Sequence, residues 1–295
     1  MTAFLSEVPA ILEGIAGLAP RYDGFILDVW GVLHDGVAPY PGVIDALERL
    51  RDSGKRVVLL SNAPVRAGTV RSRLARLGID SSLFQAIMTS GEEVWRSLSD
   101  RTDPFYAALG RRCLFVGPQR HDSMFDGLDL TLVEAPAAAD FILNTGPDDL
   151  DDDATLYRAL LEDAARRRVP MLCANADLHV MQGDTVIVCA GTLARIYEEM
   201  GGKVRWHGKP HASVYAACLD LLGPTDRPRI LCVGDSLRTD IAGANAAGLD
   251  SLLVAGGMHA GDLGAAAGPL DPDRVRAWLG RHAPQPRWVI ASLAW

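Results

Sequence analysis

The chain has 295 residues, 48% of them apolar, and a formal net charge of −8. This length favours two domains, and the apolar content is sufficient to bury a substantial core, which argues against disorder. The negative charge argues against a nucleic-acid binder that depends on neutralising phosphates. No apolar stretch approaches the length needed to cross a membrane, so no membrane partner is expected.

The five cysteines are scattered and form no Cys-x-x-Cys pair. Most lie within apolar runs, which indicates reduced, buried thiols and a cytoplasmic protein. The first twenty residues lack a basic start followed by a long apolar block, so no secretory signal is predicted.

The first part of the chain alternates helical and strand patterns. Apolar spacing predicts a helix over 6–18 with Ser6 as its N-cap, and a strand over 25–30 that is buried on both faces. Residues 31–40 are rich in glycine and proline and indicate a flap. The elements expected next are a helix over 41–52, a strand over 56–60, a helix ending near 77 and a strand over 86–89.

The middle of the chain restarts this pattern. Strands are expected at 113–116, 141–144, 171–174 and 185–188, with the clearest helix over 154–168. From Gly208 the first pattern resumes, with strands at 230–233 and 251–254, a helix near 272–280 and a short strand within 288–293. We therefore predict an α/β fold in which a doubly wound, Rossmann-like parallel sheet is interrupted by a second α/β domain. The core domain would comprise 1–89 and 206–295, and the inserted domain 90–205.

Polar residues follow the predicted strands of the core domain at four places. They are Asp28, the pair Ser61 and Asn62, Lys209, and the pair Asp235 and Asp240. In a doubly wound sheet such loops open on one rim. Two acids and a backbone carbonyl can hold Mg²⁺, while a lysine and a hydroxyl neutralise an anion. The pattern predicts a phosphoryl-transfer site with a carboxylate nucleophile, a metal and a cationic clamp.

Each of these residues also has a purely structural interpretation. Asp28 and Ser61 are good helix caps, Lys209 alone would be a surface residue, and acids such as Asp235 and Asp240 favour a helix start. All four places in this order are much harder to explain in that way.

Four segments resemble the motifs of the haloacid dehalogenase superfamily, specifically its class IIA of nucleotide, sugar and p-nitrophenyl phosphatases. In chain order they are Asp-Val-Trp-Gly-Val-Leu at 28–33, Leu-Ser-Asn at 60–62, Gly-Lys-Pro at 208–210 and Gly-Asp-Ser-Leu-Arg-Thr-Asp at 234–240. The inserted domain is similar to the α/β cap of that class. Its segments 175–177 and 190–192 are similar to substrate-facing cap signatures, which implies that Asn175 and Asp177 face the substrate.

The resemblance implies a role for each residue of the site. Asp28 would be the nucleophile, and Mg²⁺ would be held by Asp28, the Trp30 carbonyl and Asp235, with Asp240 supporting the metal site. Ser61, Asn62 and Lys209 would bind the phosphoryl group. The partner implied is a small phosphorylated metabolite, and a homodimer formed through the cap is a family-level expectation.

One position departs from the family pattern. Phosphatases of this superfamily usually carry a second aspartate two residues after the nucleophile, where it acts as general acid and base. Here that position holds Trp30, which cannot transfer a proton, and such help is worth roughly a hundred- to ten-thousand-fold. His34 or Asp35 on the flap would be the substitutes, unless they only form flap hydrogen bonds.

The expected function is therefore a Mg²⁺-dependent phosphatase that hydrolyses a small phosphomonoester, such as a sugar phosphate or nucleotide, through an aspartyl phosphate on Asp28. The alternative is a phosphoryl-binding or phosphotransferase protein of the same fold, with weak hydrolysis because of Trp30.

Overall fold

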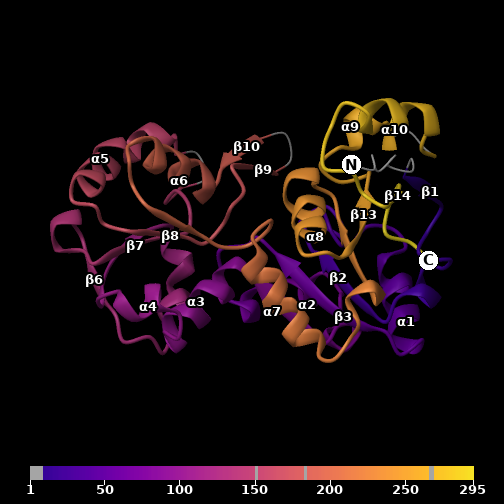
Figure 1. The fold of residues 1–295 in the computed structure, drawn as a ribbon, viewed down its shortest axis with the longest axis horizontal. Coiled ribbons are helices and arrows are strands. Elements are labelled where there is room, and N and C mark those ends of the chain that lie inside the picture. The colour runs from indigo at the N-terminus through magenta and orange to yellow at the C-terminus, as the bar shows by residue number, and fades with distance from the viewer. Residues whose placement is uncertain (1–8, 150–151, 183–184, 266–268) are drawn as a thin grey trace, which may run out of the picture. The chain divides into compact units, whose positions relative to one another are not determined.

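The computed structural model describes residues 9–149, 152–182, 185–265 and 269–295. Within these residues the strands form a seven-stranded sheet, a five-stranded sheet and a two-stranded hairpin (Figure 1). The two larger sheets are parallel in every pairing whose register is known, and helices separate their strands along the chain. The predicted α/β fold with a parallel sheet at its core is confirmed, and the second large sheet is parallel as well.

The first sheet has the order β1-β14-β13-β12-β2-β3-β4. Its strands are β1 (Ala10–Leu12), β2 (Gly24–Asp28), β3 (Arg56–Ser61), β4 (Ala86–Thr89), β12 (Ile230–Gly234), β13 (Asp250–Val254) and β14 (Trp288–Ile290). The second has the order β11-β8-β7-β5-β6, formed by β5 (Arg112–Val116), β6 (Thr131–Val133), β7 (Phe141–Asn144), β8 (Met171–Cys173) and β11 (Val204–Trp206). The hairpin pairs β9 (His179–Gln182) with β10 (Thr185–Val188).

The helices lie between these strands in sequence. They are α1 (Val43–Asp52), α2 (Ala67–Arg76), α3 (Ser90–Asp100), α4 (Pro104–Ala108), α5 (Arg158–Arg166), α6 (Ala190–Glu199), α7 (Ala212–Leu222), α8 (Ala242–Ala246), α9 (Ala260–Leu263) and α10 (Pro272–Leu279).

The contacts between residues divide the chain into two compact units. The first comprises Met1–Leu60, Arg73–Ile87 and Tyr215–Trp295, and the second Ser61–Ser72 and Met88–Val214. The first unit holds most of the seven-stranded sheet, and the second holds the five-stranded sheet. The domain boundaries expected near Ser90 and Trp206 stay a prediction.

Strand β2 lies inside the first sheet, between β12 and β3. All five of its residues are buried, and both neighbouring strands run parallel to it. A strand covered on both faces needs apolar side chains pointing in both directions, which Phe25, Ile26 and Leu27 provide. The strand ends at Asp28, which is itself buried.

The five-stranded sheet is covered on both faces, and its strands alternate between two apolar clusters. Leu114, Ile142 and Met171 pack with α5 and α6, whereas their neighbours Cys113, Phe141 and Leu172 pack with α3 and α4. Figure 1 shows α5 and α6 on one side of this sheet and α3 and α4 on the other. Successive side chains of a strand point to opposite faces, so near-continuous apolar runs fit this three-layer arrangement.

The first predicted helix is wrong where the structure describes it. Residues Ala10–Leu12 form β1, an edge strand whose Ile11 pairs with Val289 of β14. The predicted cap, Ser6, lies outside the described residues. Apolar residues spaced for a helix over such a short stretch also suit a strand, and pairing with a distant strand decided between the two.

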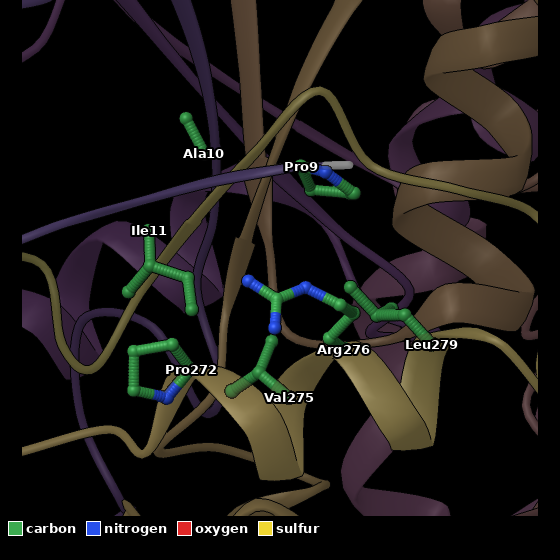
Figure 2. A pocket seen from close by; sticks show the side chains of 7 residues that line it. All are labelled: Pro9, Ala10, Ile11, Pro272, Val275, Arg276 and Leu279. Carbon is green, nitrogen blue, oxygen red and sulfur yellow. The ribbon is translucent and has the colours of Figure 1, made fainter. Parts of the chain in front are cut away.

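A pocket of about 340 Å³ lies beside β1 and α10 (Figure 2). It is lined by Pro9, Ala10, Ile11, Pro272, Val275, Arg276 and Leu279. None of these is a predicted site residue, and Arg276 supplies the only charged side chain of the lining. This pocket therefore does not provide the acids that the expected chemistry requires.

All five cysteine side chains are buried, as predicted. Among the described residues, no helix combines the length and apolar character required to traverse a lipid bilayer.

The five-stranded sheet supplies a matched pair of leucines for testing the importance of burial. Leu172 on β8 is fully buried, whereas Leu132 on β6 is 54% exposed. Leu172→Ala should lower the free energy of unfolding by roughly 2–5 kcal/mol, because it leaves a cavity in the core. Leu132→Ala should cost less than about 1 kcal/mol. Urea denaturation of both variants measures the difference, and equal losses would contradict the described burial.

Candidate active site

The structure brings Asp28, Asp235 and Asp240 together. One carboxylate oxygen from each lies within 4.8 Å of the others, and all three side chains are buried. Buried carboxylates at this separation repel one another, and a bound cation offsets the repulsion. Oxygen ligands from carboxylates are those that Mg²⁺ and Ca²⁺ prefer. These three acids therefore fit a divalent metal, and their roles as its ligands stay a prediction.

The two later acids are placed by the segment that follows β12. Asp235 comes directly after the strand, and the segment Leu237–Ile241 forms a π-helical turn, capped by the Ser236 hydroxyl accepting from the Thr239 amide. Within it the Ile241 amide donates to the Ser236 carbonyl at 3.1 Å. The hydrogen bonds of such a turn join residues five positions apart, compared with four in an α-helix, and such turns occur often at functional sites. The turn brings Asp240 back toward Asp235, and the Ser236 amide donates to the Asp240 carboxylate at 3.2 Å.

Glycines leave room for these carboxylates. A Cβ atom added to Gly31 would lie 2.0 Å from Oδ2 of Asp235, and one added to Gly257 would lie 2.3 Å from the same atom. At Gly234 it would lie 2.1 Å from Cγ of Asp240. The Met258 amide also donates to Oδ2 of Asp235 at 2.8 Å. The acids thus sit in a cradle that no larger side chain at these three positions would allow.

Trp30 lies on the flap that follows Asp28 and is 41% exposed. Its ring meets the His34 ring edge-to-face, with centroids 5.5 Å apart. Gly36, at φ +95°, leaves space for the indole, because a Cβ atom there would lie 2.5 Å from Cη2 of Trp30. The indole is therefore held by the flap, while a large part of it stays accessible. The metal-ligand role predicted for the Trp30 carbonyl stays a prediction.

Both suggested proton-transfer substitutes already take part in flap hydrogen bonds. Nδ1 of the buried His34 accepts from the Gly36 amide at 2.9 Å, and burial lowers the pKa of His34, so the imidazole is neutral at pH 7. Oδ1 of Asp35 accepts from the amides of Ala38 and Val37, and these bonds lower the pKa of Asp35. A carboxyl group with a lowered pKa is a poor proton donor at neutral pH. This geometry favours the structural role for both.

Ser61, Asn62 and Lys209 form a second group, in the other compact unit. Asn62 uses its whole side-chain amide: Oδ1 accepts from the Lys209 amide at 2.7 Å and the Ser90 hydroxyl at 3.3 Å, and Nδ2 donates to the Lys209 carbonyl and to Asp177. An amide side chain can form four such bonds, and Asn62 forms all four. Asn62 therefore fixes the backbone of Lys209.

The side chains of Ser61 and Lys209 are also buried. The Ser61 hydroxyl accepts from the Ala63 amide at 3.2 Å and keeps its own O–H for donation. Ser61 follows Leu60, which lies opposite Asp28 in the register of β2 and β3. The sequence prediction that both strands deliver a polar group at their carboxyl ends agrees with this register.

The predicted cap residues lie where two segments of the second unit meet. Oδ1 of Asn175 accepts from the Asp177 amide at 2.8 Å, and Asp177 accepts from Asn62 at 3.0 Å. The Gly191 amide donates to the Asp177 carbonyl, and a Cβ atom on Gly191 would lie 2.4 Å from that oxygen. Segments 175–177 and 190–192 are therefore in direct contact, although the sequence identified them separately.

Two family models match the chain. A haloacid dehalogenase-like hydrolase model matches residues 25–131, and a HAD-hydrolase-like model matches residues 206–294. The crystal structure of a haloacid dehalogenase-like hydrolase from Brucella suis is 34% identical, with a TM-score of 0.81, over 96% of this chain and 99% of that one. The chain belongs to the haloacid dehalogenase-like hydrolases, in class IIA.

Curated members of this family include characterised phosphatases at lower identity. The D-glycerol 3-phosphate phosphatase of Mycobacterium tuberculosis is 27% identical over 92% of this chain and 77% of that protein. The ribonucleotide monophosphatase NagD of Escherichia coli is 28% identical over 80% of this chain and 89% of that protein.

Two residues that contact the loop before Lys209 in this haloacid dehalogenase-like hydrolase were not found from the sequence. Ser90 and Glu93 lie behind Gly208: the Gly208 amide donates to Glu93 at 2.8 Å, and a Cβ atom on Gly208 would lie 1.9 Å from the Ser90 hydroxyl oxygen. Both residues are buried. In the sequence, Glu93 is an acid in the first turn of α3, directly before the apolar Val94. Sequence spacing alone does not distinguish a buried acid at such a position from an exposed one.

The glycine cradle predicts a specific loss of metal binding in this hydrolase. Gly31→Ala should displace the Asp235 carboxylate and weaken Mg²⁺ binding by about tenfold or more, because a ligand that moves away no longer contributes its charge. The measurement is the rise in melting temperature caused by added Mg²⁺.

Gly54→Ala is the matched control for backbone strain. Gly54 also has a left-handed φ, +69° against +81° for Gly31, but no atom lies within 4 Å of the point that its Cβ would occupy. Both variants should lose about 1 kcal/mol or more of stability, and only Gly31→Ala should lose the response to Mg²⁺. An unchanged Mg²⁺ response in Gly31→Ala would argue against a metal at these acids.

Proposed function

We propose that the protein is a Mg²⁺-dependent phosphatase that hydrolyses a small phosphomonoester through an aspartyl phosphate on Asp28. The observation that carries the proposal is the buried cluster of Asp28, Asp235 and Asp240 at the ends of β2 and β12. Membership of a family that contains phosphomonoesterases supports it. The acids fit a divalent cation, which when bound would neutralise the phosphate and the nucleophile and so let two anions approach.

In the first step the Asp28 carboxylate attacks phosphorus, and the bond from phosphorus to the ester oxygen breaks. The ester oxygen keeps the electron pair of that bond and takes up a proton from solvent water, which releases the alcohol. In the second step water attacks the aspartyl phosphate, which releases inorganic phosphate and restores the carboxylate. Ser61 donates a hydrogen bond to the phosphoryl oxygens. The positive charge of Lys209 stabilises the negative charge on these oxygens. Asn62 contributes by fixing the Lys209 backbone.

Substrate class and selection are also part of the proposal. The named relatives act on D-glycerol 3-phosphate and on ribonucleotide monophosphates, which are small phosphomonoesters. We assign substrate selection to the second unit, with Asn175 and Asp177 facing the substrate. Asp177 is joined to Asn62, and Asn62 to Lys209, so substrate contacts and phosphate contacts belong to one hydrogen-bonded group.

The flap supports a second candidate, a phosphoryl-binding protein or phosphotransferase with weak hydrolysis. Trp30 has no ionisable group, and the hydrogen bonds of His34 and Asp35 disfavour both as replacements. Without a general acid and base, the second step would be slow, and the aspartyl phosphate would persist long enough for another acceptor than water.

Removal of the nucleophile is the first test. Asp28→Asn should lower phosphate release by at least roughly a thousandfold, because an amide does not attack phosphorus. Release should be measured with glycerol 3-phosphate, a nucleoside monophosphate and p-nitrophenyl phosphate, in Mg²⁺ and after its removal by chelation. Asp45→Asn makes the same chemical change at an exposed helix position and should have no effect. Activity that survives Asp28→Asn would rule out the aspartyl phosphate.

Replacement of Trp30 separates the two candidates. Trp30→Asp should raise hydrolysis by roughly a hundredfold or more if the missing acid and base limits turnover. Trp30→Asn removes the same indole without supplying a proton donor and should give no such gain. Steady-state rates of both variants are compared with the unsubstituted protein. Equal rates for Trp30→Asp and the original chain would show that another group already transfers the proton.

A further inference from the structure

The backbone before and at Lys209 is fixed at successive amides. The Gly208 amide donates to Oε2 of Glu93 at 2.8 Å, and the Lys209 amide donates to Asn62 at 2.7 Å. Gly208 has φ +85°, a left-handed conformation that turns the chain between these two contacts. The position of the Lys209 backbone in the second unit thus depends on Asn62 and on Glu93. Glu93 lies in the first turn of α3.

Glu93 is a buried carboxylate whose negative charge is supported on several sides. Burial alone would raise its pKa, but hydrogen bonds and charge from His207, with further bonds from Ser213 and the Gly208 amide, outweigh this effect and lower the pKa. Glu93 is therefore ionised at neutral pH. Because a carboxylate accepts more strongly than a neutral group, its bond to the Gly208 amide is charge-assisted.

A chain of close polar contacts continues from Glu93 through His207 to Tyr106. The Tyr106 hydroxyl lies 2.6 Å from Nε2 of His207, and Nδ1 of His207 lies 3.3 Å from Oε2 of Glu93. Burial raises the pKa of Tyr106 to about 12, so its hydroxyl keeps its proton and hydrogen-bonds with Nε2 as a neutral group. Nδ1, the other ring nitrogen of His207, is the one that faces the Glu93 carboxylate.

We infer that Glu93, oriented by His207 and Tyr106, is a positioning residue for Lys209 in the proposed phosphatase reaction. The inference rests on the proposed function, because it assigns Lys209 to the phosphoryl group. The chain Tyr106–His207–Glu93 ends on the amide of Gly208, the residue directly before Lys209. All its members are buried, and a buried charge contributes little to stability compared with an apolar residue of similar size. A contribution to stability alone does not explain why these buried side chains lead to the loop that carries Lys209.

The neighbouring acid provides a matched comparison. Glu92 is also buried on α3, but it accepts from Arg66 at 2.8 Å and from the Ala67 amide at 3.1 Å, not from the Lys209 loop. Glu93→Gln and Glu92→Gln make the same chemical change one residue apart. Both should lower the melting temperature, whereas only Glu93→Gln should act on phosphate binding and turnover.

The experiment measures kcat and KM for one hydrolysed ester, and inhibition by inorganic phosphate. Glu93→Gln should reduce kcat/KM by about 10- to 100-fold and weaken phosphate inhibition by a similar factor, because small displacements of a binding group are costly in rate. Glu92→Gln should stay within about threefold of the unsubstituted protein in both. Tyr106→Phe, which keeps the ring and the packing, should fall between them and serves as the test if Glu93→Gln does not fold.

An activity-independent readout tests the contact between His207 and Glu93 itself. Nitrogen chemical shifts of His207 in histidine-labelled protein should show a proton on Nδ1, the nitrogen that faces Glu93, and Tyr106→Phe should alter this signature. Equal kinetic effects of Glu93→Gln and Glu92→Gln, or a His207 ring without a proton on Nδ1, would overturn the inference. Absence of hydrolysis and of phosphate binding in the unsubstituted protein would instead refute the proposed function, so the two failures are distinguishable.

Discussion

Electrostatic repulsion among three buried acids is the constraint on which the rest of the site depends. Asp28, Asp235 and Asp240 bring one oxygen each within 4.8 Å of the others, in an interior where repulsion is stronger than in water. The parallel strands β2 and β12 deliver these acids at one edge of the sheet, and a divalent cation among them would offset the repulsion. The repulsion is opposed by the packing of these two strands, all of whose residues are buried.

Much of this arrangement could be predicted from the sequence, since it follows from local patterns. The apolar run before Asp28 identified a buried central strand, and glycines after it marked the end of that strand. The repeat of strand, helix and strand gave the α/β class. The acids at 235 and 240 were also placed at a strand end. In each case the residues that decide the structure lie within a few positions of one another, so periodicity and turn chemistry were sufficient.

The remainder depends on contacts between residues far apart in the chain. Ala10–Leu12 became an edge strand because β14, near the opposite end of the sequence, supplied hydrogen-bond partners. Asn62 bonds to Lys209 across 147 positions, so its role in fixing that backbone has no local signal. Glu93 resembles any acid in the first turn of a helix, where such residues are favoured by the dipole, and only the folded chain brings His207 and Gly208 beside it. Single-sequence patterns do not record such pairings.

The π-helical turn at Leu237–Ile241 restricts the insertions and deletions that this segment can accept. Its hydrogen bond from Ile241 to Ser236 encloses one residue more than that of an α-helix, and with this turn Asp235 and Asp240 both reach the carboxylate cluster. Deletion of a single residue there would let α8 continue backward as an ordinary helix. Asp240 would then rotate by about 100° around the helix axis and leave the carboxylate cluster, because each residue of an α-helix advances by that angle. An insertion or deletion in this segment therefore has to preserve the helical register as well as the two acids.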